Sequence, residues 1–171
     1  MKMDICIILI ETVVLTILFT IGVVAGSKNP VDTVCDMPEP IINRCLELGL
    51  IDENRKADSP QTKRKKLGAA IIIVLIMTFT LCFVNHATNF LQGFLISYII
   101  WLIVDWYDCF VIDWIWVCHS KKLIIPGTED LVDSYKDYRF HFIGSLKGMV
   151  IGLPACLLVG VLVQIVNWIM G

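Results

Sequence analysis

Four long apolar stretches follow one another along the chain, separated by two long polar segments and one short polar connection. The apolar stretches run at about 5–25, 67–84, 90–112 and 145–170. Each is close to the roughly 20 apolar residues with which an α-helix crosses a bilayer. The pattern predicts an all-α integral membrane protein, with four transmembrane helices in a single membrane domain.

Composition supports this class of protein. Hydrophobic residues make up 57% of the chain and charged residues 18%, and the mean hydropathy is +0.76. A soluble domain has a lower apolar content. The first apolar stretch is longer than the core of a secretory signal, and only Lys2 precedes it as a basic residue, so we interpret it as a span.

Basic residues predict the orientation of the four spans. Of the 14 Lys and Arg residues, Lys2 alone precedes the first span, and the other 13 lie in the segments 27–66 and 119–147. The connection NHATN at 85–89 has none. Because basic residues accumulate in cytoplasmic loops, we expect both long loops in the cytoplasm and both termini outside.

The first predicted cytoplasmic loop, at 27–66, contains the sequence PEPIINRCLELG. Its apolar residues recur at a helical spacing: Ile41, Ile42, Cys45, Leu46 and Leu48. Gly49 follows as a candidate C-terminal cap. We expect a short amphipathic helix here, lying on the membrane surface.

The second predicted cytoplasmic loop, at 119–144, contains a further helix signal. Thr128 is a candidate N-cap, and Glu129 and Asp130 would occupy the first turn, where acidic residues are favoured. One helical face would then carry Leu131, Tyr135, Tyr138 and Phe142. The pattern predicts an interfacial helix that leads into the fourth span.

Three carboxylates interrupt the end of the third span, in the stretch VDWYDCFVIDWIWVCHSKK at 104–122. Counted from Phe90 at about 1.5 Å per residue, Asp105, Asp108 and Asp113 lie about 22, 27 and 34 Å along the helix. The hydrocarbon core is about 30 Å thick, so Asp105 and Asp108 fall in the inner leaflet and Asp113 near its edge. At about 100° per residue the three share an arc of about 140°, which is one side of a helix.

Acidic residues on one side of a span normally face the interior of a bundle or a wet cavity. For Asp113, an ion pair with a nearby basic residue is a sufficient reason for an acidic side chain at this position. Asp105 and Asp108 have no basic residue in their own span, so they are the stronger candidates for binding an ion or substrate. Groups that could assist them nearby in the sequence are His119, His141, Glu129 and Asp130.

Carboxylates together with imidazole are also candidate ligands for a divalent metal. Asp105, Asp108 and His141 would be the ligands, and an oxygen-rich set favours magnesium, calcium or manganese. No HExxH sequence, His-rich box or EF-hand loop is present in the chain. A divalent metal is therefore one alternative, beside simple hydrogen bonding by these residues.

A second polar group lies toward the opposite membrane face. Glu11 falls about 10 Å inside the first span, and Gln92 and Gln164 fall at a similar depth in the third and fourth spans. Hydrogen bonding between helices is the simpler interpretation. The alternative interpretation is that Glu11 is a further ion-binding or proton-binding residue.

The fourth span carries glycines at every fourth position: Gly144, Gly148 and Gly152. Such a ridge of small residues allows close helix contact, within one molecule or between copies. Beside the lipid bilayer, we therefore expect a homo-oligomer or a larger membrane complex as partner. The basic residues follow membrane topology, so we expect no nucleic-acid partner.

Three functions remain open on the sequence. The first is a small membrane protein that handles a cation, a proton or a small solute through Asp105 and Asp108. The second is a membrane-embedded enzyme that acts at the cytoplasmic interface on a lipid headgroup or another amphiphile. The third is a non-catalytic partner or sensor subunit in which the carboxylates are structural.

Overall fold

Four long helices dominate the computed structural model, which describes residues 5–52 and 60–170. They are α1 (Ile5–Gly26), α3 (Pro60–Phe83), α4 (Phe90–Tyr107) and α6 (Tyr138–Met170). All four are long and apolar enough to cross a membrane, and no strand occurs in the described ranges. The predicted class, an all-helical multi-pass membrane protein, is confirmed at this level.

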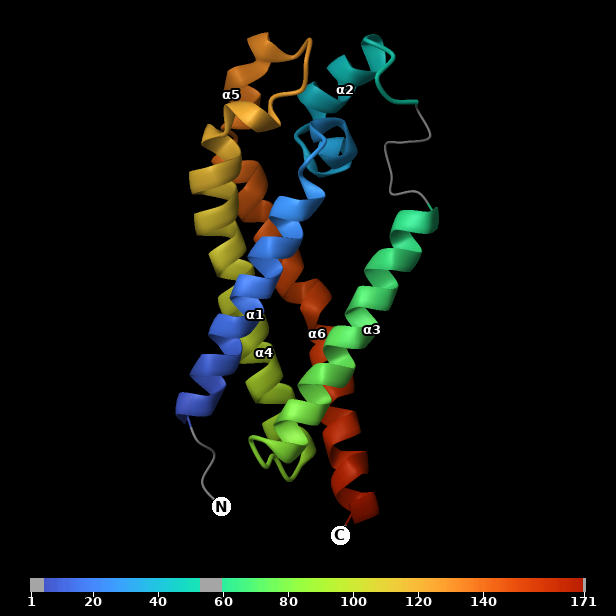
Figure 1. Cartoon of the computed structure of the whole chain (residues 1–171), viewed down its shortest axis with the longest axis vertical. Helices are drawn as coiled ribbons and strands as arrows, with labels where there is room; N and C mark the ends of the chain where they lie inside the picture. The colour runs from blue at the N-terminus through green and yellow to red at the C-terminus, as the bar shows by residue number, and fades with distance from the viewer. Residues whose placement is uncertain (1–4, 53–59, 171) are drawn as a thin grey trace.

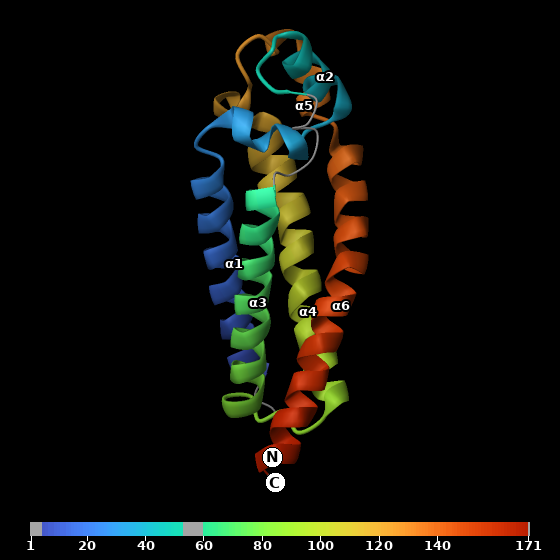
Figure 2. The same ribbon diagram turned by 90° about the vertical axis from the view of Figure 1, so that its right-hand side faces the viewer.

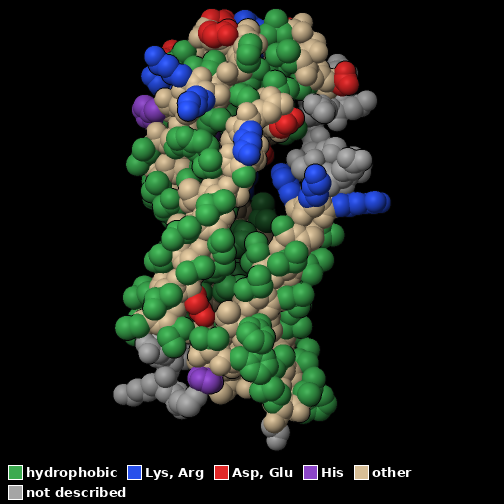
Figure 3. Space-filling view, viewed as in Figure 1, with side chains coloured by type: hydrophobic (Ala, Val, Ile, Leu, Met, Phe, Trp, Pro, Cys, Tyr) green, Lys and Arg blue, Asp and Glu red, His purple; other side chains and the backbone are tan. Residues whose placement is uncertain are grey.

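The four helices run along the longest axis of the molecule, and the two chain ends lie at the same end of the bundle (Figures 1 and 2). We call this the terminal end; the connection between α3 and α4 also lies there. The opposite end carries both long loops, with α2 (Glu39–Glu47) and α5 (Val132–Tyr135), and we call it the loop end. On the face in Figure 3, the Lys and Arg side chains all lie toward the loop end.

α4 and α6 make the closest helix contact of the bundle. A Cβ added to Gly93 of α4 would lie 2.9 Å from Val163 Cβ and 3.1 Å from Gly160 Cα. A Cβ added to Gly160 of α6 would lie 2.8 Å from the carbonyl oxygen of Phe90. Only glycine leaves room for the two backbones at this distance, as is typical of membrane helix pairs.

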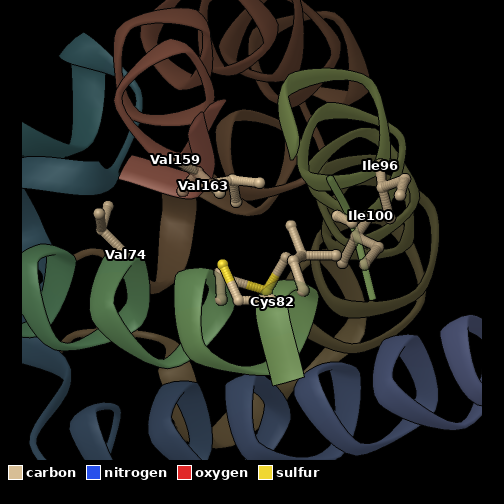
Figure 4. Packing of buried hydrophobic residues seen from close by; sticks show 9 residues of the cluster. Val74, Cys82, Ile96, Ile100, Val159 and Val163 are labelled. Carbon is tan, nitrogen blue, oxygen red and sulfur yellow. The ribbon is translucent and has the colours of Figure 1, made fainter. Parts of the chain in front are cut away.

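α3 packs on this pair through a buried cluster in the half of the bundle near the terminal end. Figure 4 shows side chains of α3, α4 and α6 meeting there: Val74, Cys82, Ile96, Ile100, Val159 and Val163. Toward the loop end, residues 63–73 of α3 are mostly exposed, and α3 diverges from the other helices (Figure 1). α3 begins at Pro60, before the predicted start of the span at 67, and so includes the basic block at 63–66.

The two loops pack on each other and form a small cap at the loop end. Its buried residues come from the first loop, α2, the second loop and α5: Val34, Met37, Ile41, Cys45, Ile51, Ile125 and Tyr135. Arg44 of α2 forms an ion pair with Asp130 of the second loop, with Nη2 3.1 Å from Oδ2. Ile41 and Cys45 are both 0% exposed. These two residues of the α2 face expected on the membrane therefore contact protein instead of lipid.

The second loop differs from the single helix expected after Thr128. It forms a turn of 3-10 helix, η6 (Glu129–Leu131), followed by α5, and α6 then begins at Tyr138. Thr128 makes no N-cap hydrogen bond, because its hydroxyl is 2.8 Å from the carbonyl oxygen of Ile125 and 2.7 Å from the hydroxyl of Tyr135. Tyr135 turns into the cap while Tyr138 is 40% exposed, so the predicted shared face is divided between two helices.

Both of the last two spans are longer than predicted. The third continues past α4 as a π-helix, η3 (Asp108–Trp116), and a 3-10 turn, η4 (Val117–His119), and the whole helical stretch Phe90–His119 has 30 residues. α6 has 33 residues and includes the second part of the expected interfacial helix, from Tyr138 onward, while the first part forms η6 and α5. Together these two helices reach from the terminal end to the cap.

We predict that Gly160→Leu destabilises the protein by about 1–3 kcal/mol, the range for overpacking a close contact. The leucine side chain has to displace Phe90, which holds α4 against α6. The measurement is thermal unfolding of the purified protein in detergent or nanodiscs. Gly22→Leu is the control, since nothing lies within 4 Å of its added Cβ. An equal melting temperature for both variants would contradict the role of this contact.

Candidate functional site: an acidic cavity at the loop end

The π-helix changes how the three aspartates are arranged. Hydrogen bonds of a π-helix join residues five apart, and here the N–H of Val117, just past its end, donates to the carbonyls of Ile112 and Asp113. Asp108 and Asp113 are five residues apart, so they lie on the same side of consecutive turns. The estimate of 100° per residue is wrong beyond Tyr107 for this reason. Single turns of π-helix frequently mark functional sites.

The three aspartates line one cavity of about 690 Å³, between the loop-end parts of α1 and α6, η3 and the 3-10 helix η1 (Pro30–Asp36). The charged side chains of its lining and its one histidine are Asp36, Asp105, Asp108, Asp113, His141 and Lys147. Four aspartates, one lysine and one histidine thus line the same cavity. Asp36 was missed by the sequence analysis, since only the folding of the first loop over the bundle brings it to the span.

α6 makes room for Asp105 by having glycine opposite it. A Cβ on Gly148 would collide with Asp105 Oδ1, and a Cβ on Gly152 would collide with the indole of Trp101. Trp101 Nε1 donates to the carbonyl of Gly148 at 3.1 Å. Asp105 Oδ2 is buried without a hydrogen-bond partner among the described residues. An acceptor with unused capacity therefore lies at the deep end of the cavity.

His141 is held at the cavity by Asp113. His141 Nδ1 lies 3.1 Å from Asp113 Oδ2, and the side chains are 6% and 22% exposed, respectively. The other ring nitrogen, Nε2, is buried without a partner in the described part of the chain. A carboxylate that holds one ring nitrogen orients the ring and leaves the second nitrogen for a ligand.

The structure does not bring the other assisting residues to this cavity. Glu129 and His119 line a separate cavity of about 440 Å³ on the cap. Glu129 Oε2 accepts from the N–H of Gly127 at 2.9 Å, and His119 Nδ1 is 2.9 Å from the carbonyl oxygen of Trp114. Asp130 is held by Arg44. Of the four residues considered as assistants to Asp105 and Asp108, only His141 lines their cavity.

Glu11 lies near the terminal end of α1, where Asn85 Nδ2 donates to Glu11 Oε2 at 2.7 Å. The two glutamines considered as partners make other bonds. Gln92 Oε1 accepts from the N–H of Thr88, and Gln164 Oε1 accepts from the N–H of Phe90. Glu11 is not among the residues that line the acidic cavity, so it belongs to a different polar site.

The predicted metal ligands do not gather as a chelating set. Within residues 5–52 and 60–170, no three His, Cys, Asp or Glu side chains are placed so that they could hold one metal ion. Asp105, Asp108 and His141 all line the cavity, but they are not placed as the ligands of one ion.

Comparisons with known proteins identify no relative. No family model, no curated protein and no solved structure matches this chain.

We predict that Asp113→Ala destabilises the protein by about 1–3 kcal/mol, the cost of a buried polar group that loses its partner. Both ring nitrogens of His141 would then be buried and unpaired. Thermal unfolding in detergent measures the effect. Asp133→Ala, at an exposed position of α5, is the matched control and is expected to leave the melting temperature unchanged. If the two variants melt alike, the pair does not stabilise the fold.

Proposed function

We propose that this multi-pass membrane protein binds a small organic cation in the acidic cavity at its loop end and transports that cation. The observation that carries the proposal is that three aspartates of one helical stretch, Asp105, Asp108 and Asp113, line a single cavity of about 690 Å³. Carboxylates at membrane depth are costly unless they are paired, and they typically mark a path for ions or solutes.

The size and lining of the cavity favour an organic cation over a metal ion. One water molecule occupies about 30 Å³ in the liquid, so the cavity is much larger than a bare ion. Apolar side chains form part of its wall: Val23, Met37, Ile112, Val117, Leu123 and Phe140. A wall of this kind suits the alkyl part of an amine, while the aspartates suit its positive charge.

The cavity also has unused acceptor atoms for such a ligand. Asp105 Oδ2 is buried and unpaired. An ammonium group would donate an N–H hydrogen bond to this oxygen and compensate the negative charge of the carboxylate. Asp108 lies on the same helix three residues later, and charges in a poorly hydrated site interact strongly. A bound cation would lower the repulsion between these two carboxylates.

We further propose that the loop end faces the cytoplasm and that the termini lie outside. The support is the charge distribution, since 13 of the 14 Lys and Arg residues belong to the loop-end segments. The acidic cavity would then open at the inner leaflet, toward the cytoplasm.

A membrane-embedded enzyme is the second candidate, and the pair of Asp113 and His141 favours it. A histidine oriented by a carboxylate at 3.1 Å, with its second nitrogen unpaired, is a plausible general base. The substrate would be an amphiphile whose headgroup enters the cavity. In that case a cation would be bound and then altered, which product analysis separates from simple binding.

The oligomer expected from the glycine ridge remains a proposal, and two of the three glycines no longer support it. Gly148 and Gly152 are covered by Asp105 and Trp101 of the same chain, while Gly144 has nothing within 4 Å of its added Cβ. The third candidate, a non-catalytic partner or sensor subunit that would bind another protein through the first loop, has less support because Ile41 and Cys45 of that loop are buried in the cap.

We predict that Asp105→Asn together with Asp108→Asn weakens binding of a primary alkylammonium ion, methylammonium or butylammonium, by tenfold or more. Each asparagine keeps the size of the side chain and removes its charge. The measurement is isothermal titration calorimetry of the protein in nanodiscs, followed by uptake of the same ions into proteoliposomes. The control, Asp133→Asn with Glu129→Gln, removes two carboxylates outside the cavity.

Binding and uptake that survive the double substitution would contradict the proposal. Binding of sodium or proton flux, without any alkylammonium binding, would replace the organic cation by a bare ion.

We also predict that Gly148→Ala weakens alkylammonium binding, because the new methyl group displaces the carboxylate of Asp105. Gly68→Ala, on α3 with nothing within 4 Å of the added Cβ and outside the lining of the cavity, should bind as the wild type does. The same calorimetric titration compares them. Equal affinities for both variants would mean that the position of Asp105 does not matter for the ligand.

A further inference from the structure

A second polar site lies near the terminal end of the bundle. Glu11 of α1 and Asn85 of the α3–α4 connection are joined by a hydrogen bond of 2.7 Å from Asn85 Nδ2 to Glu11 Oε2. Asn85 is 2% exposed. The remaining oxygen of each side chain, Glu11 Oε1 and Asn85 Oδ1, is buried without a partner among the described residues. Two buried acceptors on one hydrogen-bonded pair thus lack a donor.

The orientation of the Asn85 amide follows from its neighbours. Nδ2 lies 2.7 Å from Glu11 Oε2 and 3.5 Å from the carbonyl oxygen of Thr80, and both of these atoms are acceptors. Turning the amide over would place its oxygen against the carbonyl oxygen of Thr80, which can only accept. The unpaired atom of Asn85 is therefore the acceptor Oδ1.

One proton would satisfy both unpaired oxygens. Asn85 Nδ2 already donates to Glu11 Oε2, so if Glu11 is a carboxylic acid with its proton on Oε1, the unused acceptor Asn85 Oδ1 belongs to the residue that it already contacts. The two side chains then form a closed ring of two hydrogen bonds, the usual pairing of a carboxylic acid with a primary amide. The geometry points to Glu11 and Asn85 as a proton-binding site, separate from the acidic cavity: Glu11 carries a proton from water and becomes neutral.

The surroundings of Glu11 support a neutral side chain. No Lys or Arg occurs in α1 or in the segment 84–102, which includes the connection and most of α4. The titratable groups on these elements and on the adjoining end of α3 are Cys6, Cys82, His86 and Tyr98. None of them has a permanent positive charge, and an ionised carboxylate without a counter-charge is costly within a span.

This inference does not depend on the proposed binding of organic cations. It concerns a different end of the bundle and different residues. A monovalent metal ion held by the same two oxygens is the competing occupant, and the experiments below separate it from a proton.

The first test is infrared difference spectroscopy of the protein in nanodiscs, between pH 5 and pH 9. We expect wild type at neutral pH to show the C=O stretching band of a protonated carboxyl group, and Glu11→Gln to lose it. Asp105→Asn with Asp108→Asn should keep that band, and Asn85→Leu should shift it because the ring is broken. If Glu11→Gln leaves the protonated-carboxyl region unchanged throughout this pH range, the inference is wrong.

The second test compares the stability of two substitutions at neutral pH. Glu11→Gln replaces the O–H donor by an N–H donor, so the ring with Asn85 persists and the melting temperature should stay near that of wild type. Glu11→Ala removes the ring and should lower it by about 4 °C or more. A loss for Glu11→Gln as large as for Glu11→Ala would overturn the inference.

The competing ion gives a distinct result. Sodium binding in calorimetry that Glu11→Gln abolishes, with no protonated-carboxyl band, would also overturn the proton site. Alkylammonium binding by Glu11→Gln is expected to match wild type, so failure at this site would be distinguishable from failure at the acidic cavity.

Discussion

The close approach of α4 and α6 is the constraint on which the bundle and its acidic cavity both depend. Near the terminal end, Gly93 and Gly160 let the two backbones meet where no other residue would fit. Further along, Gly148 and Gly152 leave the space that Asp105 and Trp101 fill. In lipid, such contacts replace the hydrophobic effect as the source of association between helices. The same feature therefore stabilises the fold and places a carboxylate inside it.

Polar side chains gather at two levels of the bundle, and each level is built differently. At the loop end, charged groups from α4, the π-helix η3, the first loop and α6 line an open volume. Near the terminal end, Glu11 and Asn85 touch directly, with little access for water. Open space with several like charges suits a mobile solute, whereas a tight pair of side chains suits only a very small occupant.

Much of the fold could be predicted because the pattern of apolar residues is strong. Four spans and the grouping of both loops at one end follow from hydropathy and from the position of the basic residues. The π-helix could not be predicted, since residues 108–116 carry no proline, glycine or other local signal for it. Because of the π-helix, Asp108 and Asp113 lie on the same side of consecutive turns. The angle predicted between them at about 100° per residue was therefore wrong.

The site was predictable in part for a similar reason. Asp105, Asp108 and Asp113 stand out because they interrupt an apolar run, and His141 is close to the fourth span in the sequence. Asp36 has no such signal, and Asn85 sits in a polar connection where asparagine is ordinary. Tertiary packing brings Asn85 to Glu11, which is 74 positions away in the sequence. Asp36 reaches the cavity because the first loop folds over the bundle.

The length of α6 has a consequence for the membrane around the terminal end. α6 continues 10 residues past Gly160, which contacts Phe90 at the start of α4, and this is about 15 Å at 1.5 Å per residue. Its last residues, Trp168, Ile169 and Met170, are 81%, 72% and 60% exposed. Asn167 and Gln164 of α6 bond to the backbone of Ala87 and Phe90, so the polar α3–α4 connection lies beside the last turns of α6. Only three residues of α6 extend past Asn167, about 4.5 Å, and a mismatch costs the bilayer a fraction of a kcal/mol per Å.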